Sequence, residues 1–136
     1  MPDTSRRGTR IAHLGIAVES LGSLLPFFRD VLGLPEVPLA DSDGARIAGL
    51  AAGESLVELL ESDTAGSPIE KFIARRGPGI HHVCFSVDDL DATLDRCRRA
   101  GIRLIDETPR IGAEGKRIAF LHPNATGGVL VELSDH

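Results

Sequence analysis

The tetrapeptide LVEL occupies residues 130–133 and occurs again, letter for letter, at residues 56–59. A second matched pair lies upstream of each copy, because AHLGIAVESL at 12–21 aligns with HHVCFSVDDL at 81–90. This alignment places one histidine on another, and it pairs the glutamates of the two LVEL copies. The chain therefore consists of one module used twice, each with an early histidine and a late glutamate.

Both histidine segments, 10–18 and 80–87, alternate as β-strands do. We expect the large apolar side chains of each strand to pack on a helix. The opposite face of each strand carries the histidine and small side chains: His13, Gly15 and Ala17 in the first, and His82, Cys84 and Ser86 in the second. Small neighbours should leave open space beside each imidazole.

A helix is predicted after each histidine strand. Ser20 can cap the first helix, which should run to about Leu32 and end at Gly33, with a kink or a late start at Pro26. In the second module, Asp88 or Asp89 should begin a helix that runs to residue 100.

A third, short helix should join the two modules. The run from Ser67 to Glu70 combines a capping serine, a proline in the first turn and a glutamate three residues after the cap, and Gly77 ends the helix. Residues 34–44 read as a loop or irregular edge strand. Further strands are predicted at 46–50, 55–60, 102–105, 117–121 and 128–133. Each module is then β-α-β-β-β.

Size and composition limit the class of protein. The 136 residues suit one domain, 42% of them are apolar, and the net charge of −5 argues against a nucleic-acid partner. No apolar run is long enough to cross a bilayer, and the polar start is not a secretion signal. The only two cysteines, Cys84 and Cys97, fit a cytoplasmic protein with reduced thiols.

The repeat predicts a metal site. Glu58 and Glu132 each lie between leucines in an apolar strand, where a buried carboxylate needs a cationic partner; an arginine is the alternative to a metal. Joined with His13 and His82, they offer two imidazoles and two carboxylates, which neutralise a divalent ion such as Co²⁺, Mn²⁺, Fe²⁺, Ni²⁺ or Zn²⁺. A six-coordinate ion would keep two positions for a substrate that chelates through two oxygens.

Five other residues are weaker candidates. Cys84 is expected to line the cavity, although it could be a soft ligand, and His81 should point to the opposite face. His122 reads as a loop residue that could contact substrate. Lys116 and Arg117 follow a glycine-rich turn, which is either simply solvated or binds a phosphate or carboxylate of the substrate.

With these residues in hand, the chain resembles the vicinal oxygen chelate superfamily and, within it, the methylmalonyl-CoA epimerases. The resemblance runs from residue 11 to 133 and is most specific in four stretches: GIHHV at 79–83, IGAEGK at 111–116, FLHP at 120–123 and GGVLVEL at 127–133. It implies an α+β fold in which paired βαβββ modules form a cupped mixed sheet. It divides one domain into a flexible start (1–9), a first module (10–66), a linking helix (67–79) and a second module (80–136).

The resemblance also implies an activity. The family's metal ligands fall on His13, Glu58, His82 and Glu132, and cobalt is the metal it favours. The implied reaction is epimerisation at C2 of (2R)- and (2S)-methylmalonyl-CoA by a homodimer. The family uses two acidic residues as acid and base, one of them the last-strand glutamate, here Glu132. Some members carry the other on the third strand, but residues 46–50 contain no acid, so Glu58 or a metal-bound water is expected to serve.

Two other functions of the same fold stay open at this stage. A glyoxalase I-type lactoylglutathione lyase shares the ligand pattern, but the turn and last-strand motifs fit the epimerases better. A metal-free module that binds antibiotics generally lacks the four ligands present here. An extradiol dioxygenase is less favoured, because its common forms are longer.

Overall fold

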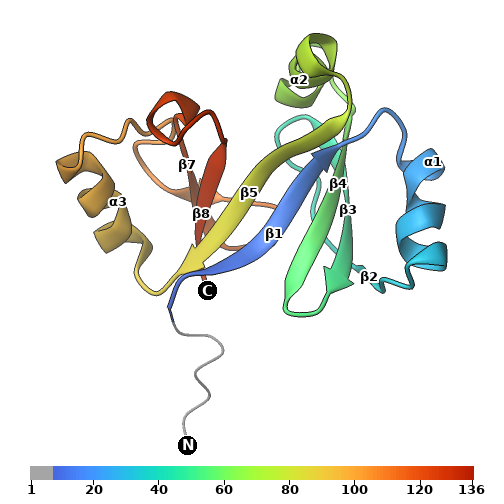
Figure 1. Cartoon of the computed structure of the whole chain (residues 1–136), viewed down its shortest axis with the longest axis horizontal. Helices are drawn as coiled ribbons and strands as arrows, with labels where there is room; N and C mark the ends of the chain where they lie inside the picture. Colours follow the sequence, from blue (N-terminus) through green and yellow to red (C-terminus); the bar gives the residue numbers. More distant parts are fainter. Residues whose placement is uncertain (1–7) are drawn as a thin grey trace, which may run out of the picture. The chain divides into compact units, whose positions relative to one another are not determined.

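The computed structural model describes residues 8–136 (Figure 1). The predicted flexible segment 1–9 therefore lies almost wholly outside the described residues. The chain divides into two compact units, one formed by His13–His81 and the other by His82–His136 together with residues 8–12. The module boundaries expected from sequence remain a prediction.

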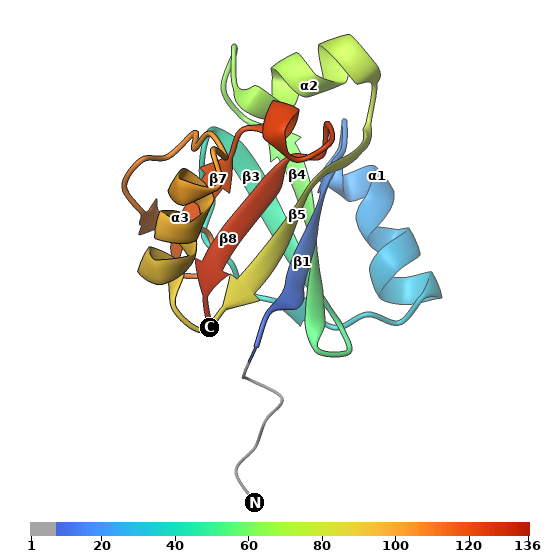
Figure 2. The ribbon, with the colours of Figure 1, turned by 60° about the vertical axis from the view of Figure 1, so that its left-hand side comes forward.

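The unit His13–His81 contains four strands in the order β2-β3-β4-β1, of which β1 and β4 are parallel and the others antiparallel. Strands β1, β4 and β3 run side by side in Figures 1 and 2. Its elements are β1 (Arg10–Ala17, which begins in the other unit), α1 (Leu21–Leu25), a π-helical segment η1 (Pro26–Val31), β2 (Glu36–Val37), β3 (Ala45–Ala52), β4 (Ser55–Ser62) and α2 (Pro68–Arg76).

The unit His82–His136 repeats this plan with the order β5-β8-β7-β6, and β5 and β8 are again the parallel pair. Its elements are β5 (Gly79–Val87, which begins in the other unit), α3 (Leu90–Arg99), β6 (Arg110–Ile111), β7 (Arg117–Leu121), the 3₁₀ turn η2 (Pro123–Ala125) and β8 (Val131–Asp135). Both units are βαβββ with mixed strand directions, so the predicted fold class is confirmed.

The two units also have the same register between their parallel strands. In one unit Gly15 lies opposite Glu58, and in the other Cys84 lies opposite Glu132. Gly15 and Cys84 are matched positions in the repeat, each two residues after the histidine. Each histidine therefore has the same relation to the glutamate of its own unit.

Each histidine strand packs its large face on a helix, as predicted. Ile16 and Val18 lie in a cluster with Leu21 and Leu24 of α1. Phe85 and Val87 of β5 pack in the same way against Leu90 and Leu94 of α3. Burial of these apolar faces, worth about 25 cal/mol per Å², fixes which side of each strand carries the histidine.

At one position the small face of β1 is not open. Ala17 is fully buried and packs against Leu60 and Ile69, so α2 fills the end of this face. The joining helix is amphipathic, and Ala17 gives it an apolar surface to cover. The open space predicted beside the imidazole of His13 stays a prediction.

The predicted helix between Ser20 and Leu32 is not one continuous α-helix. Ser20 caps it as expected, since its side chain accepts from the Ser23 N–H at 3.3 Å. From Pro26 the backbone is π-helical, and the Leu32 N–H donates to the Phe27 carbonyl at 2.9 Å. Proline cannot donate the next α-helical hydrogen bond, which explains why the geometry changes there.

The predicted strand at 102–105 is wrong. Only Leu104 forms an isolated bridge, to Leu121, and the Ile102 N–H is taken by the Cys97 carbonyl at the end of α3. The edge strand of this unit is instead β6, and the last strand begins later than the predicted residue 128.

The remaining helix predictions hold. Ser67 caps α2, and Asp89 rather than Asp88 caps α3. Among the described residues, no helix has the length and apolar character needed to cross a membrane.

Candidate metal centre

The unit His13–His81 holds a buried histidine–glutamate pair. His13 Nδ1 lies 3.1 Å from Glu58 Oε2, and each residue is only 3% exposed. Glu58 is opposite Gly15 on the neighbouring parallel strand, while His13 is two residues earlier on the same face. Because Gly15 has no side chain, the carboxylate has room to reach back to the imidazole.

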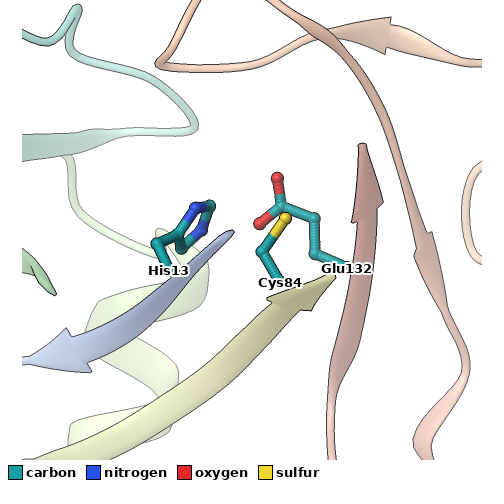
Figure 3. A group of neighbouring side chains, drawn as sticks. All are labelled: His13, Cys84 and Glu132. Carbon is teal, nitrogen blue, oxygen red and sulfur yellow. The ribbon is translucent and has the colours of Figure 1, made fainter. Parts of the chain in front are cut away.

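The unit His82–His136 holds the matching pair. His82 Nε2 lies 3.1 Å from Glu132 Oε1, and these residues are 6% and 5% exposed. Here Cys84 stands where the first unit has glycine, and it is fully buried. Figure 3 shows the Cys84 sulfur beside the Glu132 carboxylate, and it also labels His13 of the other unit.

The chemistry of these side chains fits a divalent metal ion. In the described part of the chain, the histidines, carboxylates and thiol that could hold a metal are His13, Glu58, His82, Cys84 and Glu132, all buried. Adjacent ligands of an octahedral ion, each about 2.1 Å from the metal, lie about 3 Å apart. The nitrogen–oxygen distance within each pair is 3.1 Å, so each pair is already spaced as two neighbouring ligands would be.

An aromatic and charged network surrounds the second pair. The ring of Phe120 meets the His82 imidazole edge to face, with centroids 5.4 Å apart. The Arg110 guanidinium lies 5.6 Å from the centre of the same ring, and its Nε donates to Asp106 at 3.1 Å. The sequence does not mark Asp106 or Arg110 as site residues, since Asp106 lies in a loop and Arg110 in the two-residue strand β6; Phe120 lies in the FLHP motif.

Lys116 and His122 lie at opposite ends of β7. Lys116 Nζ is 4.0 Å from Glu114 Oε1. His122 caps the turn η2, and its Nδ1 accepts from the Asn124 N–H at 3.3 Å. A five-residue strand spans about 17 Å, so β7 separates these two residues, and their roles in substrate binding stay a prediction.

His81 has the structural role predicted for it. Its ring packs edge to face on Phe72 of α2, with centroids 5.0 Å apart. It alternates with the buried His82 and is itself partly exposed. Only the second histidine of the pair therefore joins the candidate site.

Comparison with known proteins gives the family. Residues 12–120 match the model of the Glyoxalase/Bleomycin resistance protein/Dioxygenase superfamily. The chain belongs to this superfamily. An ethylmalonyl-CoA/methylmalonyl-CoA epimerase of Cereibacter sphaeroides is 38% identical over 128 residues, which cover 91% of this chain and 96% of that protein.

Solved structures within the superfamily identify the class of enzyme. The methylmalonyl-CoA epimerase of Mycobacterium tuberculosis is 38% identical, with a TM-score of 0.88 over 99% of this chain and 92% of its own. A methylmalonyl-CoA epimerase in complex with methylmalonyl-CoA and NH4+ is 36% identical, with a TM-score of 0.89 over 93% of this chain and 94% of its own. The resemblance drawn from sequence is confirmed, and the chain is an enzyme of the epimerase class.

Proposed function

We propose that the chain epimerises methylmalonyl-CoA at C2 and that one divalent metal ion is required. The observation that carries this proposal is the duplicated His–Glu pair, at the same register in both units and with the same 3.1 Å spacing. Relatives of this similarity are named as methylmalonyl-CoA epimerases, and one is described in complex with that substrate.

The metal ligands in this proposal are His13, Glu58, His82 and Glu132. Two neutral imidazoles and two carboxylates balance a 2+ charge, and this mixed nitrogen–oxygen set suits cobalt, with manganese, nickel, iron or zinc as alternatives. When bound, the ion supplies positive charge next to the substrate's thioester and carboxylate oxygens, which stabilises the negative charge that develops on the thioester oxygen.

Glu132 acts as the base in this proposal. Its carboxylate takes the C2 proton, and the electron pair of the broken C–H bond moves toward the thioester carbonyl. Glu58, once it has taken a proton from water, returns it to the opposite face of C2. We assign the second role to Glu58 because β3, its neighbour in the sheet, carries no aspartate or glutamate.

Deuterium exchange at C2 tests this function. Wild-type protein in deuterated water should exchange the C2 proton of methylmalonyl-CoA, and a chelator should stop the exchange. Glu132→Gln should lower the exchange rate by at least about 100-fold, since a positioned base contributes about 10²–10⁴. Glu107→Gln, an exposed residue of the same unit with the same charge change, is the control.

C2 exchange, turnover of methylglyoxal with glutathione, and metal content together separate the rival functions. Full exchange by Glu132→Gln would rule out this base. Turnover of methylglyoxal with glutathione, without C2 exchange, would identify a lactoylglutathione lyase. A purified protein without metal or exchange activity would instead be a binding module.

We also propose that the enzyme works as a homodimer in the cytoplasm. The support is the family resemblance together with two cysteines, both of which are free thiols in the described structure. Sedimentation at micromolar concentration measures the oligomeric state.

A further inference from the structure

Arg110 lies in the same unit as the proposed base and has no role in the mechanism above. We propose that its guanidinium binds the free carboxylate of the acyl group and so selects carboxylated CoA thioesters over plain ones. This inference rests on the proposed function, because it takes methylmalonyl-CoA as the substrate.

The Arg110 side chain is held in place on two sides. Its Nε donates to Asp106 Oδ1 at 3.1 Å, and its Cζ lies 5.6 Å from the centre of the Phe120 ring. The other oxygen of Asp106 accepts the Phe120 backbone N–H at 2.9 Å. A carboxylate tied to the strand therefore fixes the guanidinium over a ring of that strand, which lowers the entropy lost when it binds an anion.

Phe120 connects this arginine to the catalytic pair. It lies opposite Glu132 in the antiparallel pairing of β7 and β8, and its ring touches the His82 imidazole edge to face at 5.4 Å. One aromatic ring therefore separates Arg110 from His82, on the unit that holds the proposed base. The arginine side chain is 37% exposed, so an anion can reach it from solvent.

The charges of the proposed reaction call for a cation at this place. The substrate carboxylate brings negative charge to a site that already holds Glu132, and proton removal from C2 adds negative charge to the acyl group. Arginine stays protonated at any working pH and binds carboxylates through its planar fork. A guanidinium has five N–H donors, and the Nε of Arg110 donates to Asp106.

The experiment compares two ligands on three variants. Methylmalonyl-CoA and propionyl-CoA share the thioester and the CoA moiety, and only the first has the carboxylate. The variants are Arg110→Gln, Arg110→Lys and the control Arg98→Gln. Arg98 has a similar side-chain exposure of 41% and also pairs with a nearby acid, Asp95, but it lies on α3.

We expect Arg110→Gln to weaken methylmalonyl-CoA binding by about 10- to 100-fold, as the loss of a charged hydrogen bond does. Propionyl-CoA binding should change less than about threefold, and Arg110→Lys should recover part of the loss. Arg98→Gln should leave both affinities unchanged. The melting temperature of each variant checks that the fold is kept, including the hydrogen bond from the Phe120 N–H to Asp106.

Two results would overturn the inference. Equal losses for both thioesters would place Arg110 against the CoA moiety or give it a structural role, and unchanged binding of methylmalonyl-CoA would remove it from the site. Both results leave C2 exchange by the wild-type protein intact. Absence of that exchange would instead defeat the proposed function itself.

Discussion

At the scale of single residues, each of the two glutamates pairs with a histidine, but the two need different roles. Each is buried beside a histidine at 3.1 Å, so either could hold a metal. Epimerisation, however, requires a proton to leave one face of C2 and another to arrive on the opposite face. Two carboxylates on different strands can divide these two proton transfers. A variant of one glutamate should therefore separate proton removal from proton return.

Glu58→Gln should therefore keep exchange and lose epimerisation. The amide oxygen can still bind a metal, and Glu132 can still remove the proton that faces it. Interconversion of the two epimers should fall by about 10²–10⁴, because the amide does not return a proton. NMR of each separate epimer in deuterated water measures both rates.

The matched control for this variant is Glu54→Gln, on the exposed turn before β4. It changes the net charge equally and should not alter either rate. If Glu58→Gln interconverts the epimers at the wild-type rate, the second acid is another group, such as a water molecule.

The site residues differ in how far sequence could reveal them. His13, Glu58, His82 and Glu132 follow from the repeat, because duplication marks a position twice. Arg110 has no counterpart in that pattern and sits in a two-residue strand. Its place depends on a hydrogen bond to Asp106 and on the Phe120 ring, which tertiary folding alone brings together.

At the scale of elements, the short strand β2 depends on a glycine in β3. Gly49 pairs with Val37 of β2 and with Glu58 of β4. A Cβ at this position would lie 2.5 Å from Leu39 Cδ1 and 2.9 Å from the Val37 carbonyl oxygen. The leucine side chain can turn away, but the backbone oxygen moves only with β2 itself.

Gly49→Ala should destabilise the protein by about 1–3 kcal/mol, the usual cost of overpacking. Urea unfolding measures this, and Leu39→Ala in the same chain should recover only part of the loss. As a control, Gly22→Ala in α1 meets no atom closer than 3.8 Å and should stabilise the protein by about 0.5–1 kcal/mol. Equal stability of Gly49→Ala and wild type would show that β2 is free to shift.

An ion pair ties the start of α3 to β7. Arg117 Nη2 lies 2.8 Å from Asp91 Oδ1, and this guanidinium holds the pKa of the Asp91 carboxyl below its usual value. A lowered folded-state pKa stabilises the protein above the unfolded pKa, about 3.9, and the gain disappears as pH falls through the folded value.

Arg117→Gln should therefore lower the melting temperature slightly at pH 7, because both partners are exposed. The difference from wild type should shrink as the pH is lowered below about 4. Thermal melts at pH 7 and pH 3 test this. A difference that grew in acid would contradict the assigned sign.

The elements that sequence predicted well have strong local signals. Ser67 and Asp89 cap their helices through their own side chains, and alternation fixed both histidine strands. The failures have tertiary causes. At 102–105 the Ile102 N–H donates to the Cys97 carbonyl at the end of α3, and Leu104 forms one isolated bridge to Leu121 of β7. One bridge is too little for a strand, although the apolar pattern of these residues suits one.

At the scale of the whole molecule, the duplication leaves a choice between one metal site and two. Each unit has its own His–Glu pair, and two ligands alone bind a divalent ion weakly compared with four. If the pairs share an ion, neither unit retains a site when the other loses its histidine. If they act separately, removing one histidine leaves half of the metal bound.

We expect one ion per 136-residue chain, and we expect His13→Ala and His82→Ala each to lose nearly all of it. Elemental analysis of protein purified without added metal, then after titration with Co²⁺, gives the stoichiometry. Metal at 100 times its Kd should add about 2.7 kcal/mol to the free energy of unfolding of the wild type and almost nothing to either variant. His136 provides the control, because His136→Ala removes an imidazole that pairs with Asp88 and not with the glutamates. Two ions per wild-type chain, or one half retained in each variant, would mean that the units bind metal independently and that the shared centre on which the proposed chemistry depends does not form.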